Sequence, residues 1–330
     1  MPTQLPPSAF VLCLAAACGT RPASEQKETS VAARSLPAST GATRADPRRE
    51  PPSRWVGAGI ERRRLAVSVT STGSKPQPLA AEQPGSRDAS LEVTDVAYDT
   101  RRELVYVGTC CEPVSGHLWV LDTRAPASGF RQGDQGFAVD VAGPASMIAR
   151  TDTFGTLAVR ASAAGRQELR ADVGAADVAV DPLSEPRVVA LVDTRRLRAL
   201  VPTVTSRPPV LMVMQPTPEG GWADRAYRLP PDLKGCRIVP LKDGAMGILA
   251  GAPDRANPVR CTGQRLDAYD PALERLRKGV LTFPAGVRHL SIDDSKTFLI
   301  FTTIGGAVGW RTLDGREGSL ASEGFAAADW

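Results

Sequence analysis

The sequence predicts an all-β fold, a six-bladed β-propeller closed by a blade that the N-terminal and C-terminal strands share. A strand pattern recurs, the two chain ends complement each other, and long helical periods are absent. The phrase Thr94–Asp99 (TDVAYD) returns as Ala176–Asp181 (ADVAVD), and more loosely at 139–142, 289–293 and 328–330. The copies recur at intervals close to the ~40–50 residues of a four-stranded propeller blade.

Each full copy is followed by a turn signal and two further apolar segments, as expected for successive antiparallel strands. The second-strand segments are residues 104–109, 146–151, 187–193 and 297–303, and the third-strand segments are residues 117–122, 156–161, 210–215 and 307–312. A fifth copy lacks the Asp but keeps the order, at 236–241, 245–251, 265–270 and 279–284. Only Pro271–Lys278 has a helical composition, and it is short enough to be a loop turn.

The ends of the folded region complement each other. Three predicted strands open it, at 55–61, 62–71 and 75–81, with no first strand before them, and one strand, 324–330, ends the chain. One strand from the end and three from the start make a complete blade, which removes free sheet edges. Five internal blades and this shared blade give six. A double β-sandwich is the alternative.

Two of these strands carry a family resemblance. The pattern D-V-A-x-D followed by x-V-Y-V, at 95–99 and 104–107, resembles strand pairs of bacterial β-propellers of the TolB-like and YVTN or NHL types. The resemblance covers residues 55–330. It implies the fold and leaves function open, because one fold serves many functions.

The N-terminus has the features of an export signal. Residues 9–17 (AFVLCLAAA) form an apolar run too short to cross a bilayer, which takes ~20 residues. The small residues before Cys18 resemble a bacterial lipobox, which implies cleavage there and a lipid on the Cys18 sulfur. We therefore expect a signal peptide at 1–18, a disordered tether at 19–54 and the propeller at 55–330. The region before the apolar run has no Lys or Arg, a departure that keeps another exported form, or a cytosolic protein, open.

Four cysteines remain beyond the signal region, and an exported protein would oxidise them. We expect one disulfide between Cys236 and Cys261 and a vicinal one between Cys110 and Cys111 in the loop CCEPVSG. The vicinal ring would staple the loop, or present a flat sulfur face to a ligand. A metal site made of Cys110, Cys111 and His117 is a weaker alternative.

Acidic residues recur in the predicted first strands, which line a propeller's channel. The candidate ring at the channel mouth consists of Asp95, Asp140, Asp177 and Asp329, with His289 in the equivalent slot. Converging carboxylates could bind Ca²⁺, or one could act as a general base; lactonase-like six-bladed enzymes use a channel metal in this way. The favoured interpretation is that these side chains accept hydrogen bonds from nearby loop amides, as Asp commonly does in turns.

The predicted function is non-enzymatic. The sequence has no G-x-S-x-G, H-E-x-x-H or P-loop motif, and its net charge of +4 is scattered, with no basic stripe for nucleic acid. We expect a monomeric scaffold without a cofactor, anchored by lipid at the bacterial cell envelope, that recognises a protein or peptide on one loop face. The alternative is a calcium-dependent hydrolase or lactonase-like enzyme with its site in the channel.

Overall fold

The computed structural model describes residues 49–61, 64–81, 92–110, 116–143, 147–152, 154–161, 167–182, 186–193, 208–253 and 261–330. The regular secondary structure of these residues is β-strand, apart from two short 3₁₀ turns, η1 (Pro126–Ser128) and η2 (Lys242–Gly244). None of the helices in this part of the chain is long and apolar enough to cross a membrane. The predicted signal peptide, Cys18 and most of the predicted tether lie outside the described residues.

Four antiparallel sheets have four strands each. In spatial order the first is β23 (Ala327–Asp329), β1 (Arg54–Glu61), β2 (Arg64–Ser71) and β3 (Pro78–Ala81). The second is β4 (Glu92–Asp99), β5 (Leu104–Cys110), β6 (His117–Asp122) and β7 (Arg131–Gln135). The third is β8 (Ala138–Ala142), β9 (Met147–Thr151), β10 (Thr156–Ala161) and β11 (Gln167–Asp172). The fourth is β12 (Ala175–Asp181), β13 (Arg187–Val192), β14 (Val210–Pro216) and β15 (Trp222–Arg228).

The fifth sheet has seven strands because one long strand belongs to two sets of pairs. Its order is β16 (Gly235–Pro240), β17 (Met246–Pro253), β18 (Cys261–Asp270), β19 (Arg275–Ile292), β20 (Phe298–Thr303), β21 (Val308–Thr312) and β22 (Glu317–Ala321). Residues 275–282 of β19 pair with β18 and residues 287–292 pair with β20, and Val287 has a partner in both strands, Gly263 of β18 and Thr303 of β20. The segment predicted as a loop turn is a turn only up to Glu274, because β19 begins at Arg275.

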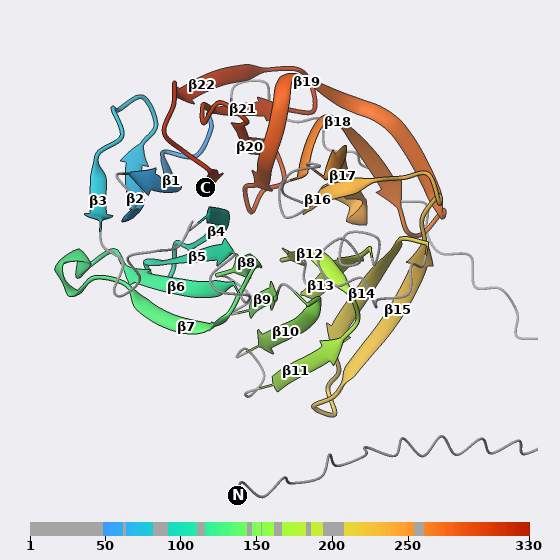
Figure 1. Cartoon of the computed structure of the whole chain (residues 1–330). Helices are drawn as coiled ribbons and strands as arrows, with labels where there is room; N and C mark the ends of the chain where they lie inside the picture. The colour runs from blue at the N-terminus through green and yellow to red at the C-terminus, as the bar shows by residue number, and fades with distance from the viewer. Residues whose placement is uncertain are drawn as a thin grey trace, which may run out of the picture. The chain divides into compact units, whose positions relative to one another are not determined.

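The sheets lie around a common centre (Figure 1), with one strand of each four-stranded sheet and two strand segments of the seven-stranded sheet nearest to it. We call these the inner strands: β4, β8, β12, β16, residues 287–292 of β19, and β23. Each inner strand contacts the next in this order, and β23 contacts β4. The C-terminal strand pairs with the first strand of the folded region, with Val56 opposite Asp329 and Ala58 opposite Ala327. The segments that the sequence predicted to share a sheet therefore lie side by side.

Apolar cores fill the spaces between neighbouring sheets. Val67 of β2 and Val105 of β5, from adjacent sheets, belong to one buried cluster, and Leu157 of β10 and Val188 of β13 belong to another. Inner strands are covered on both faces, which explains why β12 (AADVAVD) is buried along its whole length. Burial of this apolar surface is the main favourable contribution to folding.

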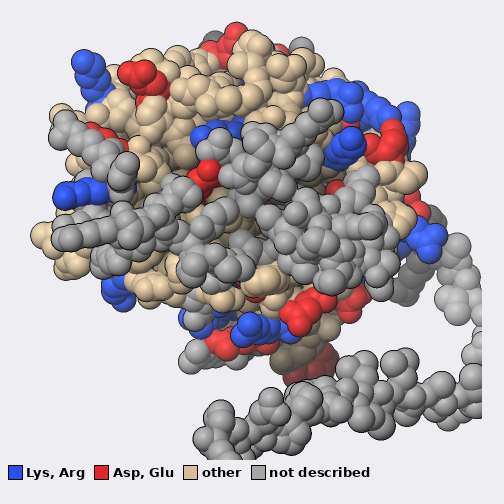
Figure 2. Space-filling model, in the orientation of Figure 1, with Lys and Arg blue, Asp and Glu red and all other residues tan. Residues whose placement is uncertain are grey.

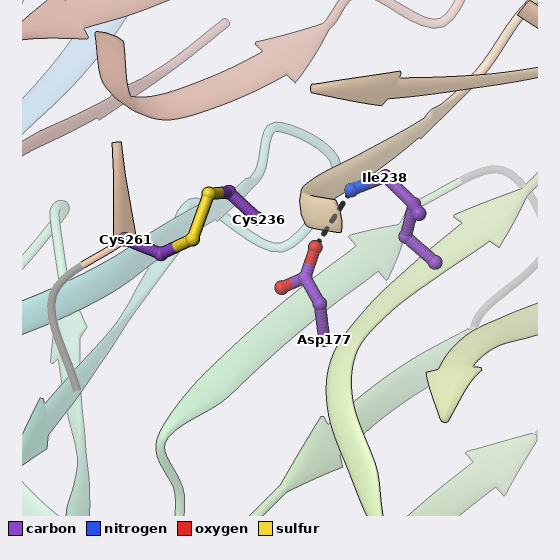
Figure 3. The surroundings of a disulfide bond; sticks show 4 residues. All are labelled: Asp177, Cys236, Ile238 and Cys261. Atoms are coloured by element: carbon purple, nitrogen blue, oxygen red, sulfur yellow. Dashed lines mark hydrogen bonds between the residues drawn. A yellow bond between two sulfur atoms is a disulfide. The ribbon is translucent and has the colours of Figure 1, made fainter. Parts of the chain in front are cut away.

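A disulfide joins Cys236, in β16, to Cys261, at the start of β18 (Figure 3). The predicted pairing is therefore confirmed, and both sulfurs are buried. The bond spans β17, where a Cβ on Gly251 would lie 2.0 Å from the Thr262 carbonyl oxygen and 2.7 Å from the Cys236 sulfur. Only glycine fits there without displacing the backbone. Cys110 is buried and disulfide-bonded, but its predicted partner Cys111 lies outside the described residues.

We expect the double variant Cys236→Ala/Cys261→Ala to lose about 3–4 kcal/mol of unfolding free energy, because the bond closes a chain segment with a sequence separation of 25. Urea denaturation of both proteins, monitored by tryptophan fluorescence, measures this loss. The single variant Cys236→Ala controls for the removed sulfur. An unchanged midpoint in the double variant would contradict the stabilising role.

Candidate functional site

The inner strands bring all five predicted polar residues to the centre of the molecule, together with a sixth. The predicted ones are Asp95 (β4), Asp140 (β8), Asp177 (β12), His289 (β19) and Asp329 (β23), and Arg237 of β16 joins them. All are at most 7% exposed, except Asp140, which is partly exposed. The set is therefore a buried centre, where the sequence predicted a ring at a channel mouth.

Four carboxylates join neighbouring inner strands. Each accepts a hydrogen bond from a main-chain amide of the adjacent inner strand. These contacts are Asp95 Oδ2 with the Val139 amide (3.0 Å), Asp140 Oδ2 with Val180 (2.7 Å), Asp177 Oδ2 with Ile238 (2.8 Å, Figure 3) and Asp329 Oδ2 with Tyr98 (2.8 Å). We call this set the amide belt. The favoured sequence interpretation placed the donors in loops, whereas these donors are residues of inner strands.

His289 continues the belt at the next boundary. Its Nδ1 accepts a hydrogen bond from the Ala328 amide of β23 (3.4 Å), and its Nε2 lies 2.5 Å from Asp95 Oδ1. Because Nδ1 faces a donor, the ring proton belongs on Nε2, which donates to Asp95. Burial lowers the pKa of His289 most, despite the opposing charge of Asp95. A neutral imidazole with this tautomer satisfies both contacts.

Arg237 occupies the slot where the fifth copy lacks its Asp. Its Nη1 donates to Asp95 Oδ2 (2.7 Å) and to Asp177 Oδ1 (2.8 Å), and its Nη2 donates to the Thr94 carbonyl. The guanidinium thus lies between two buried carboxylates, where its fixed donors can serve several acceptors at once. It supplies the positive charge that a bound cation would otherwise provide.

The arrangement shifts the pKa values of the central groups in opposite directions. Burial raises the pKa of Asp95, but the nearby Arg237 and His289 outweigh it and hold this pKa below its usual value. Burial also opposes the charge on Arg237, yet Asp95 and Asp177 raise its pKa. These groups therefore form a charged cluster at neutral pH.

Within the part of the chain that the structure describes, no cationic side chain pairs with Asp329 or Asp140. Burial raises the pKa of Asp329 to about 7, although hydrogen bonds from Ser291 and the Tyr98 amide lower it in part. Burial, and then the charge of Asp329, raise the pKa of Asp140 well above its usual value. One side of the centre consequently carries carboxyl groups that keep their protons to higher pH than an ordinary Asp.

The space left in the centre is small. A cavity of about 40 Å³ is bordered by Asp140, Asp177, Arg237, His289 and Ser291, among others. One water needs ~10–15 Å³ by such a measure, whereas small-molecule sites usually measure ~300–1,000 Å³. Within the described residues, no three His, Cys, Asp or Glu side chains are grouped to hold a metal ion. The centre in this state accommodates water and no organic substrate.

Of the other predicted ligand set, Cys110 and His117 lie in the described residues. His117 lies on β6, where its Nδ1 is 3.0 Å from Gln132 Nε2 and its ring meets Trp119 edge-on. The loop that carries Cys111 lies outside the described part of the chain. The proposed roles of Cys110 and Cys111 in binding therefore stay predictions.

Sequence reasoning missed Arg237 and Ser291. Ser291 donates to Asp329 Oδ1 and follows His289 by two positions, so both face the centre from one strand. The signal for Arg237 was the slot itself, since the fifth copy reads CRIVPL where the others have Asp or His.

Comparisons with known proteins identify the architecture. No family model and no curated protein matches the sequence. Among solved structures, a chain from a crystal structure of a nidogen/laminin complex aligns with 83% of this chain and 97% of its own length, at a TM-score of 0.52 and 11% identity. The Cps50 (Swd1) β-propeller domain of Myceliophteria thermophila aligns with 70% of this chain and 68% of its own, at 0.42 and 14%.

The fold is a β-propeller. At these identities the likeness concerns the fold alone. In a β-propeller the inner strands line a central channel, so the amide belt is the lining of that channel. The cluster around Arg237 fills it.

We expect Arg237→Met to destabilise the propeller by about 3–5 kcal/mol, because two buried carboxylates lose their shared cation. Urea denaturation at pH 7 measures the change. Adding Asp95→Asn and Asp177→Asn to Arg237→Met should restore part of the lost stability, since no unpaired charge remains. A single variant as stable as the parent protein would show that the carboxylates do not depend on Arg237.

We expect the stability of the propeller to fall as pH rises through about 7, partly because of Asp329. Its pKa is raised from 3.8 to about 7, so the folded state holds a proton that the unfolded chain releases. The stabilisation is therefore complete below the unfolded pKa and is lost as pH rises through the folded pKa. One such group changes the unfolding free energy by at most about 1.4 kcal/mol per pH unit.

The variant Asp329→Asn tests this, because its amide can donate to Ser291 and accept from Tyr98 without titrating. Its unfolding free energy should decline less than that of the parent protein between about pH 5 and pH 8. Asp232→Asn, whose parent side chain is 72% exposed, is the control and should keep the parent pH dependence. Parallel curves for all three proteins would contradict the assignment to Asp329.

Proposed function

We propose that the chain is a six-bladed β-propeller closed by a blade built from β23, β1, β2 and β3. Counting the two halves of the seven-stranded sheet separately, with β19 serving both, gives six blades. The pairing of β23 with β1 and the circuit of contacts among the inner strands support closure. Closure would leave no inner strand at the edge of the ring.

We propose that this propeller is a non-enzymatic scaffold that binds a protein partner on one face. The observation that carries this proposal is the filled channel: its carboxylates accept hydrogen bonds from amides and from Arg237, and its cavity of about 40 Å³ has room for water alone. Recognition then falls to the loops, which a rigid sheet framework holds in place. The compared nidogen/laminin structure is itself a complex of proteins, which is compatible with such a role. Figure 2 shows basic and acidic side chains interspersed on the visible surface, without a field of one sign.

The favoured face is where the second and third strands of each blade connect. Register places these connections beside the beginnings of the inner strands, as with Thr303 opposite Val287 and Thr151 opposite Ala138. We call this the hairpin face. Among its described residues, three large apolar side chains are exposed there: Ile304 (62%), Phe154 (49%) and Ile60 (38%). Such side chains on supported turns are suited to contact a protein.

The position of the segment before β1 also favours the hairpin face as the partner-binding face. Arg316 Nη1 donates to the Arg49 carbonyl (2.7 Å), and the Thr72 hydroxyl donates to the Pro52 carbonyl (2.5 Å). Both donors lie in turns at the opposite face. If Cys18 carries a lipid, the connection from the membrane would reach the propeller on that side and leave the hairpin face free. Export and anchoring at the bacterial envelope are thus part of the proposal; Cys18→Ser should shift the protein from the membrane to the soluble fraction.

Site-specific photo-crosslinking in the native envelope tests the scaffold function. We expect a crosslinker at Ile304 or Phe154 to capture one partner protein, identified by mass spectrometry. A crosslinker at Leu273, which is 70% exposed in the β18–β19 turn of the opposite face, is the matched control and should not capture it.

Equal capture from both faces, or none from the hairpin face, would contradict the proposal. Metal analysis of the purified protein addresses the calcium-dependent hydrolase. One stoichiometric divalent ion per chain, together with hydrolysis of a lactone, would favour that enzyme over the scaffold.

A further inference from the structure

The outer edges of the sheets differ in charge. Edge strands expose unpaired backbone groups, and charged side chains commonly keep other chains from pairing with them. Outer strands β7 (RQGDQ), β11 (QELRAD) and β15 (WADRAYR) carry such charges, as does the outer half of β19, which begins RLRK. Two outer strands do not: β3 (PLAA) has no charge, and β22 (EGSLA) has only its first residue, Glu317.

These two unprotected strands border the same groove. It has a volume of about 650 Å³, which lies in the range of binding pockets, ~300–1,000 Å³. One wall is β22 with the loop after it, including Ser319 and Leu320. The other wall is the end of β1, β2, the β2–β3 turn and Pro78 of β3. The groove reaches the hairpin face at Ile60.

Among the described strands, β22, which lines this groove, has a strand partner on one edge and none on the other. The partner is β21, with Gly309 opposite Ser319 and Trp310 opposite Gly318. β22 is the last strand in its sheet. Among the described strands, none pairs with its outward edge. At ~3.4 Å per residue, its five residues offer about 17 Å of backbone.

The side chains of the groove have a polarity along its length. Apolar Ala66, Leu320 and Phe325 line it, and exposed Glu61 and Glu323 lie at the end near the hairpin face. Exposed Lys75, in the segment between β2 and β3, lies toward the opposite face. An extended peptide with a cation at one end and a carboxylate at the other would match these charges.

We propose that an extended segment of the partner protein adds to β22 as a further strand within this groove. Main-chain hydrogen bonds to β22 would supply affinity, and alternate side chains would contact Leu320 and Phe325. The cationic end of the segment lies beside Glu61 and Glu323, and its acidic end lies beside Lys75. This inference rests on the proposed scaffold function, because it names how the scaffold holds its partner.

Hydrogen exchange on the full chain tests strand addition with two capped peptides as probes, Lys-Thr-Val-Thr-Val-Thr-Glu and the reverse sequence. We expect the first peptide, Lys-Thr-Val-Thr-Val-Thr-Glu, at millimolar concentration to slow hydrogen exchange at the amides of β22 at least tenfold. Exchange at the amides of β7, β11 and β15 should stay unchanged. The reverse peptide should bind at least threefold more weakly, because its charges oppose those of the groove.

A charged edge residue supplies the matched variants. Ser319→Lys places a charge at an exposed position of β22 and should abolish the protection of β22 by the peptide. Ala226→Lys places the same charge at an exposed position of β15 and should leave that protection unchanged. Thermal melting of both variants checks that they fold. No protection of β22, or equal protection of β7, β11 or β15, would overturn the inference.

Two outcomes would assign the groove to another occupant and so overturn the inference as well. A dimer in sedimentation that Ser319→Lys dissolves would make the occupant a second copy of the chain. Protection of β22 without peptide that disappears when residues 1–48 are removed would make it the chain's own N-terminal segment. Crosslinking from Ile304 and Phe154 is independent of β22, so the scaffold proposal can stand if strand addition fails.

Discussion

The architecture depends on hydrogen bonds between the carboxylates of inner strands and the amides of their neighbours. Five of the six inner strands present an Asp or His toward the centre, and that side chain accepts a hydrogen bond from a main-chain amide of the next inner strand. Asp95 on β4 reaches Val139 on β8, and Asp329 on β23 reaches Tyr98 on β4. These bonds set the height of each sheet relative to the next. Apolar packing between sheets could not fix this height alone, because apolar contacts have little directionality.

The amide belt also places several carboxylates close together in the interior, and Arg237 compensates part of their negative charge. Several buried carboxylates close together repel one another, and burying each charge is costly. Arg237 neutralises two of them, Asp95 and Asp177, while the raised pKa values of Asp140 and Asp329 reduce the charge on the rest. Replacing Asp by Arg in one slot of the repeat therefore balances the centre without an external ion. The same substitution fills the space in which a channel enzyme would hold its substrate.

Because the channel is filled, a protein partner would have to bind on the outer surfaces of the propeller. The hairpin face offers apolar side chains on supported turns, and the groove beside β22 offers a sheet edge whose one charged residue is Glu317. Both meet near Ile60, between the sheet of β23, β1, β2 and β3 and the sheet that ends in β22. A partner could therefore contact apolar side chains and pair its backbone within one continuous area. The charged edges elsewhere limit such pairing to this junction.

The sequence by itself determined the strand order, the pairing of the two chain ends and the Cys236–Cys261 bond, because these depend on local alternation and on repeats along the chain. It also identified Asp95, Asp140, Asp177, Asp329 and His289, since inner strands repeat one polar slot. The outer strands β7, β11, β15 and β22 escaped prediction, because strands at a solvent edge have weak apolar alternation. Only the tertiary structure decided that Arg237 joins Asp95 to Asp177, that amides of adjacent strands hold the carboxylates, and that β22 and β3 share a groove. Those facts concern residues far apart in the chain, and their distances are set by how the sheets pack around the centre.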